Sequence, residues 1–366
     1  MNILSLQNNI SKWLENMTLG LDSGRFRFCS NSSFVPVTGM EGQVSTCFAM
    51  KAAWQAGIWD KWPEERKKAC INFVYSFQKP DGCFHDPWLC RNAKTGWRDF
   101  ANLILGHIDC DGIRQKKTRN IRAETRQTAS TLMMVGAGLK YPLPIEISLA
   151  DEVEPYIESF NWELPWSAGS HLSHQIMFLT INHICFDISE HYYDIIERIL
   201  FCLEKFRDPI TGTWFEGNTP DNIKINGAMK IFSGLQWLDK PYPDCTNLLD
   251  FALEQPFQCD GCGFLNRLFV VQQALKGSPK NFRQHDIHRL AVLAWEEIQK
   301  FRKPDGGFSF YQDKSQVSYY SAKVSKGYPV SDLHGATMMC WAIALIMELL
   351  GEKAPNEAKQ WKIHKA

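Results

Sequence analysis

Apolar residues recur along most of the chain at the three- and four-residue spacing of a helix, and two kinds of helical segment alternate. In the first kind, charged residues stand between the apolar positions, as in YYDIIERILFCLEKF at 192–206. This pattern predicts a helix with one face on the core and one face in water. Six segments have it, and we expect them to be outer helices: 3–17, 66–77, 146–160, 192–206, 246–257 and 288–301.

Segments of the second kind open with a few polar residues and are then small or apolar on every face. A helix without a polar face is stable in a soluble protein only where neighbours bury it on all sides. The pattern therefore predicts six inner helices, at 41–57, 122–138, 171–184, 224–238, 266–277 and 331–351.

A degenerate turn follows four of the outer segments. Its members join Phe to a polar linker, then to Asp or Gly and a further aromatic residue. Proline cannot continue a helix and glycine supplies a positive φ, so each turn predicts a helix stop and a sharp change of direction. The four strings are FQKPDGCF at 77–84, FRDPITGTWF at 206–215, FQCDGCGF at 257–264 and FRKPDGGFSF at 301–310.

Six outer and six inner segments in strict alternation predict an all-α fold. We expect one domain over residues 1–366, an (α/α)6 toroid whose wall is the six inner helices. Alternation makes all inner helices parallel, so their N-termini meet at one mouth of the barrel. Two linkers, 85–121 and 306–330, are too long for simple connections and lead to this mouth, so we expect them to act as lids.

Polar residues gather at the predicted N-termini of the inner helices. Six helix N-termini add partial positive charge, which favours an anionic ligand group such as phosphate, pyrophosphate or carboxylate. For each single residue the alternative is a helix cap or a solvated helix end. The candidates are Gln43, Ser45, Thr46, Arg122, Glu124, Arg126, Gln127, His171, His174, Gln175, Lys224, Asn226, Asn266, Arg267, Asp332, His334 and Thr337.

Charge and composition limit the classes of partner that we expect the chain to bind. Forty basic residues balance forty acidic ones, so no overall field attracts nucleic acid, and we expect a small-molecule or lipid-like substrate. The first 17 residues are too polar for a secretory signal, and the most apolar stretch, 336–350, is short enough to predict a buried helix, so we expect no transmembrane segment. Twelve cysteines without compact spacing then predict a reducing, cytoplasmic location.

The strings KPDGGFSF, KPDGCF and FQCDGCGF resemble the Gly-Gly-Phe and QW-type repeats of the terpenoid cyclase and protein prenyltransferase superfamily. This resemblance implies a toroid enzyme that holds an apolar substrate with an anionic or polar head in its cavity. The chain departs from the family in its acid motif, because the string nearest to Asp-x-Asp-Asp is Asp109-Cys110-Asp111-Gly112.

Toroids of this kind host other chemistry, so two alternatives stay open. One is a carbohydrate-active epimerase, lyase or hydrolase, whose acid/base set would be Glu124, Asp332, His171 and His174. The other is a toroid without catalysis that binds a lipid or protein partner.

Three residues are candidates for proton transfer: Asp332, His334 and Glu124. Asp332 begins the most apolar inner helix beside His334, where desolvation raises the pKa of a carboxyl group, and the alternative is that it caps this helix. Glu124 stands between Arg122 and Arg126, which suits a structural ion pair. Their guanidinium groups also suit an anion clamp.

A zinc ion is the cofactor that the resemblance suggests. Prenyltransferase β subunits bind zinc through a similar Asp-Gly-Cys string and a later His, which implies Asp260, Cys262 and His334 as ligands here. Thiolate, imidazole and carboxylate suit zinc and leave a fourth position for substrate. The alternative is that Asp260 caps a turn, as Asp81 and Asp305 would at the equivalent positions.

Overall fold

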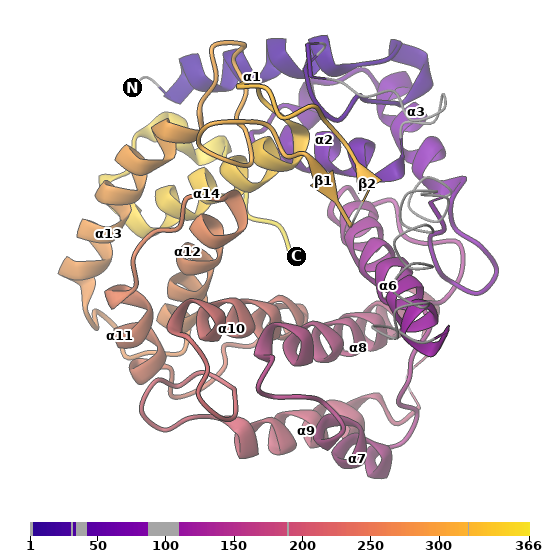
Figure 1. The fold of residues 1–366 in the computed structure, drawn as a ribbon, viewed down its shortest axis with the longest axis vertical. Coiled ribbons are helices and arrows are strands. Elements are labelled where there is room, and N and C mark those ends of the chain that lie inside the picture. The colour runs from indigo at the N-terminus through magenta and orange to yellow at the C-terminus, as the bar shows by residue number, and fades with distance from the viewer. Residues whose placement is uncertain (1–2, 31, 34–41, 87–109, 189, 321) are drawn as a thin grey trace. The chain divides into compact units, whose positions relative to one another are not determined.

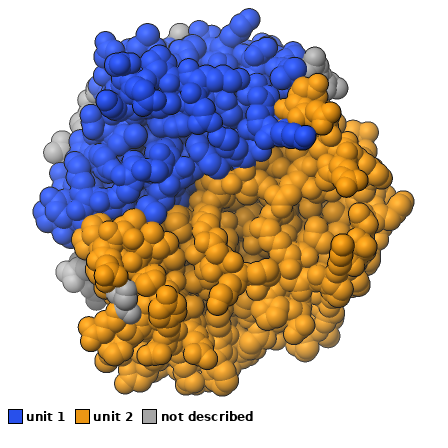
Figure 2. All heavy atoms as spheres, turned by 180° about the vertical axis from the view of Figure 1, so that it is seen from behind, with its two compact units in different colours: residues 1–141, 300–340, 359–362 blue, residues 142–299, 341–358, 363–366 orange. Residues whose placement is uncertain are grey.

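A computed structural model describes residues 3–30, 32–33, 42–86, 110–188, 190–320 and 322–366. The chain divides into two compact units, coloured separately in Figure 2. Unit 1 consists of residues 1–141, 300–340 and 359–362, and unit 2 of residues 142–299, 341–358 and 363–366.

Helices dominate the described residues, as the periodicity predicts (Figure 1). Unit 1 contains α1 (Ile3–Met17), α2 (Gln43–Gln55), α3 (Glu64–Tyr75), α6 (Cys110–Met134) and the first part of α14 (Leu333–Leu350). Unit 2 contains α7 (Val153–Glu158), α8 (Pro165–Phe186), α9 (Tyr192–Leu203), α10 (Asp221–Leu235), α11 (Thr246–Glu254), α12 (Gly261–Lys276), α13 (Gln284–Glu297) and the rest of α14. Strands β1 (Ser318–Tyr319) and β2 (Ala322–Lys323) form an antiparallel hairpin in unit 1.

Short 3-10 helices extend or connect these elements. They are η1 (Leu21–Ser23), η2 (Trp59–Lys61), η3 (Ala150–Glu152), η4 (Glu204–Phe206), η5 (Gln236–Leu238), η6 (Ile298–Phe301), η7 (Gly351–Lys353) and η8 (Asn356–Gln360).

The two predicted kinds of helix differ in burial as expected. All residues of α2 except Trp54 are buried, and three alanines let its neighbours approach closely. In α9, by contrast, Tyr193 and Phe201 are exposed, while Ile195 and Ile199 face the core. Inner helices are thus enclosed and outer helices keep one wet face.

The predicted outer helix 146–160 is shorter than expected, because only η3 (Ala150–Glu152) and α7 (Val153–Glu158) are helical. Before η3, side chains accept the backbone N–H groups and cap the start of the helix. Glu146 donates its N–H to Oε1 of Gln175 (2.8 Å), and Ser148 donates its own to Oε2 of Glu152 (2.7 Å).

The prediction of a loop over residues 85–121 is wrong for residues 110–121, because α6 already begins at Cys110. The basic string RQKKTR at 114–119 consists largely of good helix formers, so its charge does not indicate a loop. Residues 87–109 of the predicted loop, including Asp109 of the acid-like string, lie outside the described residues.

In unit 2, α8, α10 and α12 lie side by side (Figure 1). A Cβ added to Gly227 would lie 2.7 Å from Pro165, and one added to Gly234 would lie 2.7 Å from Ser173. Because later residues of α10 contact later residues of α8, the two helices run parallel. Near the start of α12, Asn266 donates a hydrogen bond to Asn226 near the start of α10 (2.7 Å). The three helices therefore begin at the same end of unit 2.

In unit 1, α2 and α6 also run parallel. Lys51 donates from Nζ to Oγ of Ser130 (2.7 Å), and one turn earlier Cys47 faces Thr128, with 3.8 Å from Sγ to Oγ1. The start of α14 packs on α2, where Thr337 donates from Oγ1 to the carbonyl of Phe48 (2.9 Å).

The repeated turns share one local device: an Asp carboxylate accepts a nearby backbone N–H. Three of the turns also pair residues across the turn, as Gln78 and Phe84 do in the first. The turn interpretation is therefore confirmed. The acceptors are Asp81, Asp208, Asp260 and Asp305, with N···O distances of 2.9, 2.7, 3.0 and 3.4 Å.

One stretch among the described residues, Leu333–Lys353, is long and apolar enough to cross a membrane, with a mean hydropathy of 1.6. The expectation that no stretch reaches this length is therefore wrong, because flanking residues extend the apolar part beyond 336–350. Buried residues make up 83% of its most apolar 18-residue window, and core helices of soluble proteins pass the same test.

Candidate functional site

The first candidate site lies in unit 1, where the start of α2 faces the middle of α6. Glu124 is 1% exposed, and no described residue makes a hydrogen bond of normal geometry to either carboxylate oxygen. Burial, and then the nearby charge of Asp86, raises the pKa of Glu124 to about 8. The side chains of Tyr319 and Gln43 lie close enough to favour the ionised form, but they offset only part of this rise.

Lys51 lies two turns further into α2 and is 2% exposed. Its Nζ donates to Oε1 of Gln127 (3.1 Å) as well as to Ser130. Burial, and then the charge of Arg126, lowers the pKa of Lys51 to about 7. A carboxyl group protonated at pH 7, near a lysine that is half deprotonated there, is an arrangement suited to proton transfer.

Arg126, predicted as an anion clamp, is buried beside the β1–β2 hairpin. Burial lowers its pKa, and the hydroxyl groups of Tyr320 and Tyr319 partly offset this effect. The hairpin belongs to the predicted lid 306–330, so this segment reaches the same site.

His334 begins α14 between two phenyl rings, with ring centroids 4.6 Å from Phe48 and 4.7 Å from Phe310. Its Nδ1 shares a hydrogen bond with Oε1 of Gln316 (2.8 Å). The ring of Tyr319 meets it edge-on at 5.5 Å, and Tyr319 also faces Glu124. The structure thus brings His334 and Glu124 to one part of unit 1.

Asp332 has the contacts of a helix cap. Its carboxylate accepts the backbone N–H groups of Gly335 (2.8 Å), Phe310 (2.9 Å) and Gln316 (3.0 Å), and the residue is fully buried. Burial raises its pKa to about 6, although these N–H groups favour the ionised form. The capping alternative is therefore observed, and proton transfer by Asp332 stays a prediction.

A second candidate site lies in unit 2, where a pocket of about 240 Å³ opens at the starts of α10 and α12. Asn226 and Arg267, both predicted to bind substrate, line this pocket. Its other lining residues are Asp221, Asn222, Ile225, Gln255, Pro256, Gln258 and Gly263.

Several polar side chains in and beside this pocket bind one another or the backbone. Arg267 donates from Nε to the carbonyl of Ala252 (3.0 Å) and from Nη2 to that of Leu253 (2.7 Å), and burial lowers its pKa to about 10. Lys224 forms an ion pair with Asp221 at 3.0 Å. Arg267 thus secures the end of α11, which is a structural task.

The remaining predicted residues do not line this pocket. His171 is half-buried, with its ring centroid 5.4 Å from that of Phe160, and His174 bonds through Nδ1 to the carbonyl of Ser170. Arg122 is half-buried in unit 1, two residues before Glu124. Because these residues belong to two units, a mouth shared by all of them stays a prediction.

The predicted zinc ligands also come from both units. Asp260 caps α12 by accepting the N–H of Gly263 (3.0 Å), and burial raises the pKa of the Cys262 thiol to about 12. His334 bonds Gln316 in unit 1. The capping alternative for Asp260 is observed, while the three-ligand site stays a prediction.

Sequence reasoning missed Lys51, Asp86 and Tyr319. The sequence did contain a signal for Lys51. This lysine lies among the apolar residues of CFAMKAAW, in a predicted helix without a solvent-exposed face, so its charged group was expected to be buried. Asp86 and Tyr319 belong to long irregular segments with no periodicity, and only the folded chain brings them to Glu124.

Comparison of the chain with protein-family models, with curated proteins and with solved structures finds no match.

Proposed function

We propose that this chain is an enzyme that transfers protons at the α2–α6 site, with Glu124 as donor and Lys51 as acceptor. The observation that carries the proposal is the carboxyl group of Glu124, which is buried and meets no hydrogen-bond partner of normal geometry among the described residues. An unsatisfied buried polar group costs about 1–3 kcal/mol. A folded protein retains such a group where a ligand or an ordered water supplies the missing hydrogen bond.

Neighbouring polar atoms support a substrate with hydroxyl or anionic groups. Nε2 of Gln127 is likewise buried without a hydrogen-bond partner in the described part of the chain, and the Gln43 side chain, which lies against Glu124, makes no hydrogen bond of normal geometry there. Arg126 adds a guanidinium group suited to carboxylate or phosphate. Tyr319 adds a hydroxyl group that lies against Glu124.

The acidity of Glu124 favours a carbohydrate-type substrate. A carboxyl group with a pKa near 8 is a weak acid, and an alkene carbon accepts a proton far less readily than an oxygen atom does. Glu124 is better matched to a glycosidic or hydroxyl oxygen, or to a carbon beside a carbonyl group. We therefore place an epimerase, lyase or hydrolase first.

A terpene cyclase-like or prenyltransferase-like enzyme is the second candidate. The rings of Phe48, Phe310 and Tyr319 around His334 favour it, because aromatic faces stabilise carbocations. In this reaction Arg126 would bind the anionic head of the substrate.

We also propose that the twelve helices form the single (α/α)6 toroid, in a cytoplasmic protein. Enclosed inner helices, half-wet outer helices and the parallel inner helices within each unit support the toroid. The described cysteines form no disulfide with one another, which supports a reducing compartment.

The test compares the wild type with Glu124→Gln, which keeps the shape of the side chain but has no acidic proton. Exposed Glu254→Gln serves as the matched control. Each protein is incubated in D2O with a panel of aldoses, uronates and glycosides and, separately, with farnesyl and geranylgeranyl diphosphate, and products are followed by NMR. We expect turnover of a carbohydrate, reduced at least about 100-fold in Glu124→Gln and unchanged in the control.

Turnover of the prenyl diphosphates alone would select the second candidate. Full activity of Glu124→Gln would overturn the role of this carboxyl group. The absence of any turnover by the wild type would favour the alternative of a toroid that binds a partner without catalysis.

A further inference from the structure

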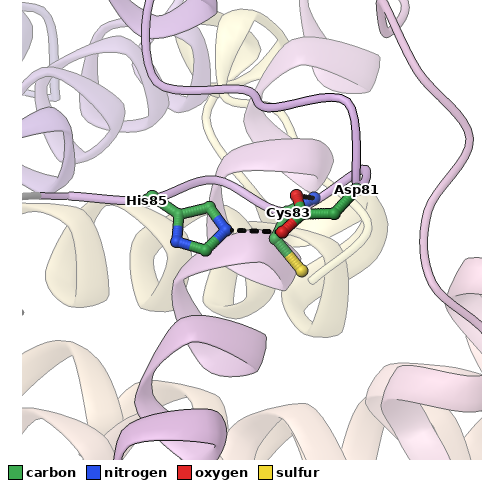
Figure 3. A group of neighbouring side chains, drawn as sticks. All are labelled: Asp81, Cys83 and His85. Atoms are coloured by element: carbon green, nitrogen blue, oxygen red, sulfur yellow. Dashed lines mark hydrogen bonds and ion pairs between the residues drawn. The ribbon is translucent and has the colours of Figure 1, made fainter.

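The turn after α3 brings three metal-ligating side chains together. Asp81, Cys83 and His85 are alternate residues, and one ligand atom of each lies within 4.8 Å of the others. Oδ1 of Asp81 accepts the N–H of Cys83 (2.9 Å), and Oδ2 lies 2.9 Å from Nε2 of His85. In Figure 3 the imidazole ring points toward Asp81, with Cys83 beside both.

A matched turn in the same unit lacks two of these ligands. The string KPDGGFS at 303–309 pairs Arg302 with Phe308 as the first turn pairs Gln78 with Phe84. Its Asp305 also accepts a backbone N–H, but Gly and Ser stand where Cys83 and His85 stand. The turn itself therefore requires the aspartate and neither the thiol nor the imidazole.

Space explains why the second turn has glycine. A Cβ added to Gly307 would lie 2.6 Å from the ring of Trp13 and 2.8 Å from Ser331. In the first turn, Cys83 and His85 are half-buried and Asp81 is exposed, so an ion has access from solvent.

We propose that Asp81, Cys83 and His85 bind a zinc ion at the surface of unit 1. Carboxylate, thiolate and imidazole are zinc ligands, and a four-coordinate ion would keep one position for water. Ligand atoms around tetrahedral zinc lie about 3.4 Å apart, given bonds of about 2.1 Å. The 2.9 Å contact and the 4.8 Å limit bracket this value, so small side-chain rotations suffice.

Zinc would change the protonation of the cluster. Burial, and then the charge of Asp81, raises the pKa of the Cys83 thiol to about 11, so without metal this thiol keeps its proton. The ion would displace that proton to solvent, and the proton that Nε2 of His85 shares with Asp81 would move to Nδ1 or to solvent, so that both side chains could bind the metal. Its charge offsets both anionic ligands, and binding weakens in acid.

The site would brace a segment that leads to Glu124. Between the ligands, Phe84 donates its N–H to Oγ1 of Thr125 (3.0 Å), the residue after Glu124 in α6. Directly after the ligands, Asp86 accepts the N–H of Gln43 (3.0 Å). The zinc proposal itself does not depend on the proposed function.

The experiment titrates the full chain, stripped of metal by a chelator, with Zn²⁺ by calorimetry and with Co²⁺ by absorption. We expect about one ion per chain and a thiolate-to-cobalt charge-transfer band. Cys83→Ser should lose the band and weaken zinc binding at least about 100-fold. Asp81→Asn, which keeps the acceptor of the turn hydrogen bond, should weaken binding while the far-ultraviolet circular dichroism stays unchanged.

Cys185→Ser is the matched control, because this half-buried cysteine belongs to neither ligand set, and it should bind zinc like the wild type. Cys262→Ser tests the ligand set implied by the resemblance. Loss of binding in Cys262→Ser with retention in Cys83→Ser would overturn the proposal, and so would a wild type that binds no zinc.

Discussion

The starts of the inner helices are similarly polar in both units, but their side chains have different environments. In unit 2, Asn266 bonds Asn226 and Arg267 bonds two backbone carbonyl groups, although Nε2 of Gln175 in α8 is buried without a hydrogen-bond partner among the described residues. In unit 1, buried polar atoms of Gln43, at the start of α2, and of Glu124, in the middle of α6, meet no hydrogen-bond partner of normal geometry among the described residues. Polar helix starts that bind one another hold the fold together, whereas those left unsatisfied leave capacity for a ligand.

The largest expected effect is on the pH dependence of stability in unit 1. The pKa of Glu124 is about 8 in the folded chain against an ordinary 4.5, so the folded state binds the extra proton between these pH values. This contribution to stability is complete below pH 4.5 and is lost as the pH rises toward 8. In the wild type this loss of unfolding free energy should be on the order of a few kcal/mol. Glu124→Gln has no titrating carboxyl group, so its unfolding free energy should not show this loss.

Urea denaturation of the wild type and Glu124→Gln checks this prediction. Lys51, with a pKa lowered to about 7, has the opposite effect, because stability rises with pH between about 7 and its ordinary 10.5. The comparison is therefore made below pH 7. If the unfolding free energy changes with pH by the same slope in the two proteins, the pKa of Glu124 is not raised.

Alanine substitutions of Arg267 and Arg126 should differ in their effect on stability, and this effect is smaller than the one expected for Glu124. Arg267→Ala removes two charge-assisted hydrogen bonds to α11 and should cost about 2 kcal/mol or more of unfolding free energy. Arg126→Ala should keep its melting transition and weaken the binding of an anionic probe such as glucuronate. Thermal melts with and without the probe measure both.

Loss of the melting transition in Arg126→Ala would instead make this residue a structural partner. Unchanged stability of Arg267→Ala would remove the difference drawn between the two units.

Periodicity predicted the helices because the spacing of apolar residues reports which faces are buried. It identified α2 and α9 as different kinds, and the Asp-containing strings as turns. It placed one helix start too early, where Glu152 caps the chain before η3, and it was wrong where a charged string is a good helix former, as at the start of α6.

The candidate site was predictable only in part. Glu124, Arg126 and His334 were predicted at helix starts, and the structure brings them to one part of unit 1, but α6 begins at Cys110, so the prediction that Glu124 and Arg126 lie at a helix N-terminus is wrong. Which of them lacks partners depends on residues far away in sequence, such as Gln43 and Tyr319, and helix periodicity does not position these. The spacing Asp81-x-Cys83-x-His85 was readable, but the turn accounted for its aspartate and the two other ligands were overlooked.

The protonation state of Glu124 tests the central claim most directly. Infrared difference spectroscopy of the wild type against Glu124→Gln isolates the C=O stretch of this one carboxylic acid. We expect a protonated band that is present at pH 7 and disappears with a midpoint of about pH 8. A band already lost near the ordinary pKa of 4.5 would show an ionised carboxylate at neutral pH and would rule out Glu124 as the proton donor.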